Sequence, residues 1–73
     1  MEKVEEIIDL GDLDERFYAI VGRGDENLKL FSQLFGVKVL ARGTEIRIRG
    51  EEEKVQNMSR FIREILRSLL RVP

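Results

Sequence analysis

The stretch VKVLARGTEIRIR, residues 37–49, predicts a β-hairpin, and the rest of the fold is built outward from it. Apolar and polar residues alternate on either side of Arg42-Gly43-Thr44, as in paired strands that bury one face. We therefore expect strands at residues 37–42 and 44–49. The side chains expected on the buried face are Val37, Val39, Ala41, Ile46 and Ile48. Those expected on the open face are Lys38, Leu40, Arg42, Glu45, Arg47 and Arg49.

After the hairpin, Gly50 releases the chain into a long helix expected at residues 51–71. Glutamates fill its first turn, and arginines lie near its end, which suits the helix dipole at both ends. Its apolar side is formed by Val55, Met58, Ile62, Ile65, Leu66 and Leu69. Its opposite side carries a basic stripe formed by Arg60, Arg63, Arg67 and Arg71. We expect this stripe to be solvated, and docking onto an acidic surface is the alternative.

Before the hairpin, a run rich in β-branched residues predicts a first strand at residues 4–10, which Gly11 ends. Asp12 and Glu15 have the spacing of a capping box, so a short helix is expected to begin there. The residues that follow at helical spacing are Leu13, Phe17, Ile20 and Val21. The alternative is a strand at residues 17–21, because that run is aromatic and β-branched.

A second helix is expected at residues 26–35, with Asp25 as its N-cap and Gly36 as the left-handed residue that ends it. Its apolar stripe is formed by Leu28, Phe31, Leu34 and Phe35. Tyr18 cannot fully share the apolar face of Phe17, so it is the one aromatic candidate for an exposed ring on which a base stacks. The aromatic residues assigned to the core are Phe17, Phe31, Phe35 and Phe61.

The predicted element order is β-α-α-β-β-α, which indicates one α+β domain spanning residues 1–73. Residues 1–11 form an acidic leader with the first strand, and residues 12–71 hold the two short helices, the hairpin and the closing helix. The first strand completes a three-stranded sheet, so we expect a two-layer sandwich with three helices on one face. The other face is open to water. Pro73 is expected to begin a linker.

The composition excludes several kinds of active site. The 73 residues contain no cysteine and no histidine, which rules out thiol nucleophiles, histidine acid–base catalysis and structural zinc. No metal site is expected, because the carboxylates do not gather at ligand spacing. An apolar span is missing and the N-terminus is acidic, so we expect a cytoplasmic protein without a membrane partner.

The formal net charge of −1 hides an asymmetry. Residues 1–15 contain seven acids and one base, which gives −6, whereas the remainder carries +5. An acidic leader therefore precedes a mildly basic body.

The candidate binding segment is VGRGDENL, residues 21–28, between the two short helices. Its glycines let a ligand approach the backbone closely, and the following helix start presents unpaired N–H groups to an anion. Arg23 and Lys29 add positive charge nearby. The alternative is a tight turn between helices, in which Asp25 caps the second helix and Asn27 makes a local hydrogen bond.

Three spaced motifs in the chain resemble those of a KH domain. They are Ile20-Val21-Gly22-x-x-Asp25-x-x-Leu28-Lys29, Phe35-Gly36-Val37-x-Val39 and Glu45-Ile46-x-Ile48-x-Gly50. The resemblance covers residues 17–70, and it implies a KH-like fold whose Gly-x-x-Gly loop grips single-stranded RNA or DNA. Asp25 departs from this pattern, because nucleic-acid-binding members have glycine there and a carboxylate repels phosphate.

A narrower set of positions is similar to the N-terminal region of the PhoH-like proteins, which are phosphate-starvation-inducible P-loop ATPases of bacteria. These positions are Gly22-x-x-Asp25-x-Asn27-Leu28-Lys29, Gly36-Val37 and Ala41-Arg42-Gly43-x-Glu45. In that family the region precedes the nucleotide-binding domain. The chain has no Gly-x-x-x-x-Gly-Lys-Ser/Thr loop, so the resemblance assigns ATP and magnesium to an ATPase domain outside these residues.

The expected function is binding of single-stranded RNA or DNA, with no catalysis and no cofactor in this domain. The residues expected to contact nucleic acid are Gly22, Arg23, Gly24, Asp25, Asn27, Lys29, Arg42 and Arg47. The alternative is a protein-docking module, whose partner is the following ATPase domain or a second copy in a homo-oligomer. The near-neutral charge and Asp25 favour docking, whereas the basic body and the loop favour nucleic acid.

Overall fold

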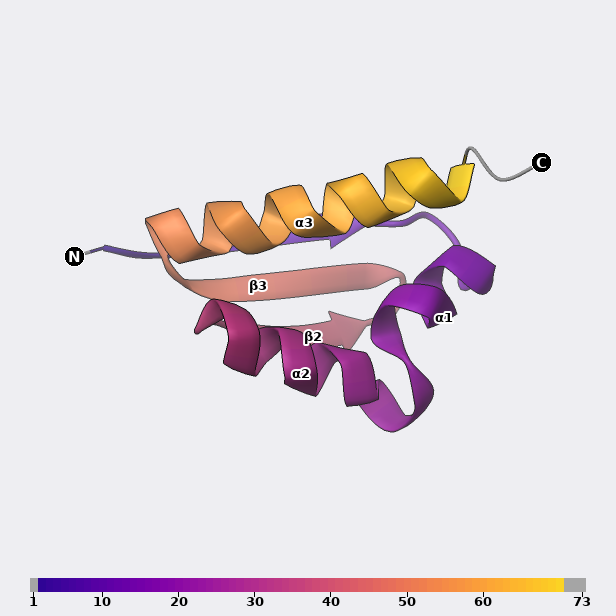
Figure 1. Cartoon of the computed structure of the whole chain (residues 1–73), viewed down its shortest axis with the longest axis horizontal. Coiled ribbons are helices and arrows are strands. Elements are labelled where there is room, and N and C mark those ends of the chain that lie inside the picture. The colour runs from indigo at the N-terminus through magenta and orange to yellow at the C-terminus, as the bar shows by residue number, and fades with distance from the viewer. Residues whose placement is uncertain (1, 71–73) are drawn as a thin grey trace.

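The computed structural model describes residues 2–70 and confirms the predicted order of elements (Figure 1). The elements are β1 (Lys3–Asp9), α1 (Glu15–Val21), the 3₁₀-helix η1 (Arg23–Asp25), α2 (Glu26–Phe35), β2 (Lys38–Arg42), β3 (Glu45–Glu51) and α3 (Glu52–Leu70). Arg71 and Pro73, which the sequence assigns to the helix end and a linker, lie outside the described residues.

The three strands form one antiparallel sheet in the order β1-β3-β2, so the first strand lies beside the hairpin as expected. Ile46 on the central strand stands opposite Ile8 on β1 and Ala41 on β2, and these three side chains therefore share the covered face. The predicted inward set is confirmed. It comprises the buried Val37, Ile46 and Ile48 and the partly buried Val39 and Ala41.

Two helices, α2 and α3, lie side by side over one face of the sheet (Figure 1). The long helix α3 packs on β1 and β3, and α2 packs on β2. The expectation that three helices cover the sheet is wrong, because the seven-residue α1 packs on α2 and α3 at the end of the layer. The result is a small KH-like α+β sandwich with one open sheet face.

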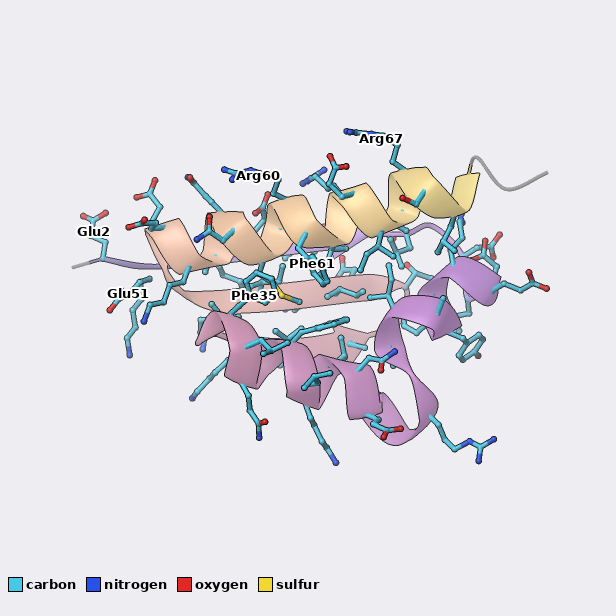
Figure 2. All side chains as sticks on the ribbon, in the orientation of Figure 1. Glu2, Phe35, Glu51, Arg60, Phe61 and Arg67 are labelled. Atoms are coloured by element: carbon cyan, nitrogen blue, oxygen red, sulfur yellow. The ribbon has the colours of Figure 1, made fainter. Side chains whose placement is uncertain are left out.

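The core lies between the sheet and the helices, and burial of its apolar side chains is the main stabilising contribution. The buried side chains are Ile8, Phe17, Ile20, Val21, Leu28, Val37, Ile46, Ile48, Val55, Met58 and Ile62. The assignment of Phe61 to this core is wrong, because its side chain is 37% exposed. It packs against Phe31 and Phe35 instead, with ring centroids 5.2 and 5.1 Å apart, between α2 and α3 (Figure 2).

Helix α1 begins at Glu15 because Asp14 caps it. The Asp14 carboxylate accepts hydrogen bonds from the N–H groups of Arg16 and Phe17, at 3.0 and 3.4 Å. The capping box expected from Asp12 is therefore wrong, because the chain bends at that residue and enters the helix later.

Other expectations about the helices and strands need correction. Leu13 precedes α1 and Leu34 lies on the outer side of α2, so both are exposed rather than part of an apolar stripe. Residues 17–21 are helical, which excludes the alternative strand. β3 continues through Gly50, which stands opposite Val4 of β1, so the last helix begins later than predicted.

Candidate nucleic-acid interface

The candidate loop joins α1 to α2 and projects from a corner of the molecule, away from the sheet (Figure 1). It begins at Gly22, whose N–H donates to the Tyr18 carbonyl at 2.9 Å and ends α1. Gly24 then adopts a left-handed conformation, with φ of 61°. A Cβ atom at Gly24 would meet nothing within 4 Å, so a ligand can reach the backbone at this point.

Gly22 and Asn27 make their contacts inside the corner between the helices. A Cβ atom at Gly22 would lie 2.8 Å from Asn27 Cγ and 3.0 Å from the Asn27 backbone nitrogen. The Asn27 side-chain Nδ2 donates to the Ala19 carbonyl at 3.1 Å, which ties the start of α2 to the last turn of α1. This geometry supports the alternative of a tight turn for these two residues.

The expected role of Asp25 as a side-chain N-cap is wrong. Its backbone is left-handed, with φ of 61°, and its side chain makes no capping hydrogen bond. An N-cap residue normally has extended backbone, which aims its side chain at the N–H groups of the first turn. Asp25 is the one non-glycine residue with positive φ in the described chain, and its exposed carboxylate remains available to repel phosphate.

Two cations flank the open backbone. Arg23 and Lys29 are exposed, and within residues 2–70 neither has a carboxylate within 4.0 Å. Both line a shallow hollow that also includes Leu30, an exposed apolar residue. The complete lining is Arg23, Gly24, Glu26, Asn27, Lys29, Leu30 and Gln33. This hollow can offer a phosphate backbone N–H groups and two positive charges.

The structure places Arg42 and Arg47 apart from the loop group. Both alternate with inward side chains, so they stand on the open face of the sheet, opposite the helices. The Arg47 guanidinium lies 3.0 Å from the Glu45 carboxylate and is therefore paired within its own strand. The predicted contacts therefore divide into a loop group and a sheet group instead of lining one groove.

Sequence reasoning missed Leu30 and Gln33 as lining residues of the loop hollow. The available signal was the position of Leu30 outside the apolar stripe of its helix, which indicates an exposed leucine. Tyr18 is exposed as expected, and its ring meets Phe17 edge to face at a centroid distance of 5.7 Å.

In the part of the chain that the structure describes, no group of three or more acidic side chains is arranged to hold a metal ion. None of the described helices is both long and apolar enough to cross a membrane.

No protein-family model and no curated protein matches the chain in sequence. The element order and the sheet topology define a small KH-like α+β domain with an exposed interhelix loop. The similarity to PhoH-like proteins rests on the motifs and stays a prediction.

Proposed function

We propose that this chain is a non-catalytic domain that binds single-stranded RNA or DNA through the α1–α2 loop. The observation that carries the proposal is the open backbone at Gly24 beside Arg23 and Lys29, two exposed cations without a carboxylate partner in residues 2–70. Phosphate groups attract such cations and unpaired backbone N–H groups. The exposed side chains of Leu30 and Tyr18 offer apolar surface for bases.

The motif similarity supports a wider proposal about the protein to which this domain belongs. In this view the chain is an accessory domain of a cytoplasmic, bacterial PhoH-like ATPase. The ATPase domain would hold ATP and magnesium, and the present domain would bring nucleic acid to it.

Binding by the isolated domain is expected to be weak. The loop presents two cations, but the carboxylates of Asp25 and Glu26 lie in the same segment and oppose a polyanion. We expect dissociation constants in the range typical of non-specific complexes, about 1–100 µM. The affinity should fall as the salt concentration rises.

The test is a titration of short single-stranded RNA and DNA at two salt concentrations, with variants of the loop. Arg23→Glu should weaken binding about tenfold, because it reverses a charge that faces phosphate. Arg60→Glu is the matched control: Arg60 is an exposed arginine on α3, and Figure 2 shows it pointing away from the sheet and the loop. This control should lower affinity much less.

Variants of Asp25 separate charge from backbone shape. Asp25→Asn removes the carboxylate and keeps a side chain that tolerates the left-handed conformation, so its gain in affinity reports charge alone. Asp25→Gly restores the Gly-x-x-Gly pattern and should bind at least as well. Absence of binding by all forms at low salt, or equal losses for Arg23→Glu and Arg60→Glu, would contradict the proposal and favour protein docking.

A further inference from the structure

The open face of the sheet carries opposite charges on its two edge strands. The rows across the face, read in the order β1-β3-β2, are Glu5–Arg49–Lys38, Ile7–Arg47–Leu40 and Asp9–Glu45–Arg42, and the pair Lys3–Glu51 lies at the start of β1. β1 therefore presents a lysine at its start and then two acids around an apolar residue, and β2 presents two bases around another. The two apolar side chains, Ile7 and Leu40, are 44% and 51% exposed.

The charges on the central strand are matched within the chain, whereas those on β2 are not. Arg47 lies 3.0 Å from Glu45, and Arg49 lies 3.7 Å from Glu5. Lys38 and Arg42, in contrast, have no carboxylate within 4.0 Å among residues 2–70. The unmatched charge on this face is therefore positive, and most of it lies along β2, with Lys3 at the start of β1 as the remaining cation of the described residues.

On β1, part of the acidic charge also stays available. The Asp9 carboxylate accepts hydrogen bonds from the Thr44 hydroxyl at 2.7 Å and the Gly11 N–H at 2.9 Å, both through Oδ1. Its Oδ2 atom accepts no hydrogen bond from the described residues. An arginine or lysine from outside the chain can approach this oxygen.

We propose that two copies of this chain pair through their open sheet faces, around a two-fold axis parallel to the strands. Such an axis lays β1 of one copy over β2 of the other. Glu5 then faces Lys38 of the second copy, and Asp9 faces Arg42 of the second copy. Ile7 meets Leu40 of the second copy between these charge pairs, and symmetry repeats each contact.

The charge pattern selects this axis over the other two-fold arrangement of the same faces. An axis perpendicular to the strands would lay β1 over β1 and β2 over β2, which sets Glu5 against Asp9 and Lys38 against Arg42. Only Arg49 against Glu45 would be attractive there. Arg47 meets its own symmetry copy in both arrangements, so it does not distinguish them. The parallel axis also sets Arg49 against Arg49 and Glu45 against Glu45 of the second copy. It nevertheless has more attractive and fewer repulsive contacts than the perpendicular axis, because each edge contact occurs twice and each contact on the central strand only once.

The predicted dimer is weak because the face is small. Strands lie about 4.8 Å apart, so three strands present a face only about 14 Å wide. A face of this width falls at or below the lower end of the interfaces seen in stable complexes, so we expect pairing only at high protein concentration. Pairing should also weaken as salt rises, because charge pairs at the rim contribute to it.

The test is sedimentation equilibrium of the 73-residue chain over increasing concentration, with two charge-reversed variants. In a dimer of Glu5→Lys, the introduced lysine faces Lys38 of the second copy at both symmetry-related contacts, so the two copies repel. In a dimer of Lys38→Glu, the introduced glutamate faces Glu5 of the second copy in the same way. Each should dimerise about tenfold more weakly than the natural chain. An equimolar mixture of the two variants should regain dimers, since every lysine introduced on β1 then faces a glutamate introduced on β2.

Leucine variants test the apolar contact. Leu40→Ser should weaken the dimer, whereas Leu34→Ser, which alters an exposed leucine on α2, should not. Circular dichroism verifies that every variant is folded. A monomer at all concentrations would overturn the proposal. Unchanged dimerisation of Leu40→Ser and of both charge-reversed variants would also overturn it. The same holds for a mixture of the two charge-reversed variants that dimerises no better than either variant alone.

Discussion

At the residue scale, Gly22 is the position where the loop tolerates a side chain least. It combines a positive φ of 78° with a virtual Cβ only 2.8 Å from Asn27 Cγ. Gly22→Ala should therefore cost about 2–3 kcal/mol in the free energy of unfolding, measured by urea denaturation. Gly24→Ala is the control: it has a similar φ but open space, so it should cost only about 1 kcal/mol. Equal losses would show that the contact with Asn27 is unimportant.

Asp25 is the residue whose replacement should raise stability. Its φ of 61° is unfavourable for a side chain with a Cβ, and no capping hydrogen bond offsets this strain. Asp25→Gly should increase the free energy of unfolding by about 0.5 kcal/mol, measured in the same denaturation experiment. Asp25→Asn keeps the Cβ and should leave stability nearly unchanged. A loss of stability in the glycine variant would mean that the carboxylate stabilises the loop.

At the element scale, the start of α1 predicts a dependence of stability on pH. The pKa of Asp14 lies below its ordinary value of 3.8, chiefly because the Arg16 side chain donates hydrogen bonds to the carboxylate, with helix N–H groups adding to this. A lowered pKa in the folded state stabilises the fold above pH 3.8, and this contribution is lost as the pH falls through the lowered value.

Asp14→Asn isolates this contribution, because asparagine remains a good N-cap but does not titrate. The melting temperature of the natural chain should fall more steeply than that of Asp14→Asn when the pH is lowered from neutral to below 3.8. Asp12→Asn removes a nearby exposed carboxylate outside the helix and should behave like the natural chain. Parallel melting curves for the natural chain and Asp14→Asn would contradict the assignment of the cap.

The hairpin and α2 were predictable because their patterns are long and have several independent markers. Strand alternation repeats on both sides of Gly43, and Gly36 ends α2 in the left-handed conformation that glycine adopts readily. The start of α1 was not predictable, since Asp12 and Asp14 are equally suitable caps. The choice depends on where the following aromatic residue, Phe17, enters the core, which is a tertiary effect.

The candidate site was predictable in part for the same reason. The loop was located correctly because its glycines interrupt two apolar periodicities. The position of Asp25 before α2 predicts a capping role, but the chain turns from α1 to α2 with this residue in the left-handed conformation. The strand alternation correctly predicts that Arg42 and Arg47 stand on the open face of the sheet. It does not reveal that the loop lies on the helical side, beyond the other face of the sheet.

At the scale of the whole molecule, the two proposed surfaces lie on different parts of the fold. The loop projects from the helical layer, whereas the paired face is the uncovered side of the sheet (Figure 1). Nucleic acid and a second copy should therefore bind without direct competition. Leu40→Ser should weaken the dimer and leave the affinity for single-stranded RNA unchanged, and a loss of both would indicate a shared surface.

The fold as a whole rests on a single core in a small chain without disulfides, so one large cavity should remove much of its stability. A domain of this size has a free energy of unfolding of roughly 4–11 kcal/mol.

Ile62 is completely buried on α3, between the helices and the sheet. Ile62→Ala should cost about 3 kcal/mol, whereas Ile62→Val, which removes one methylene group, should cost about 1 kcal/mol. Leu34→Ala, at a residue that is 68% exposed, should change stability by less than about 0.5 kcal/mol. Urea denaturation measures all three variants, and the valine variant keeps the test decisive if the alanine variant does not fold. Similar costs for Ile62→Val and Leu34→Ala would contradict the tight packing of Ile62 between the helices and the sheet.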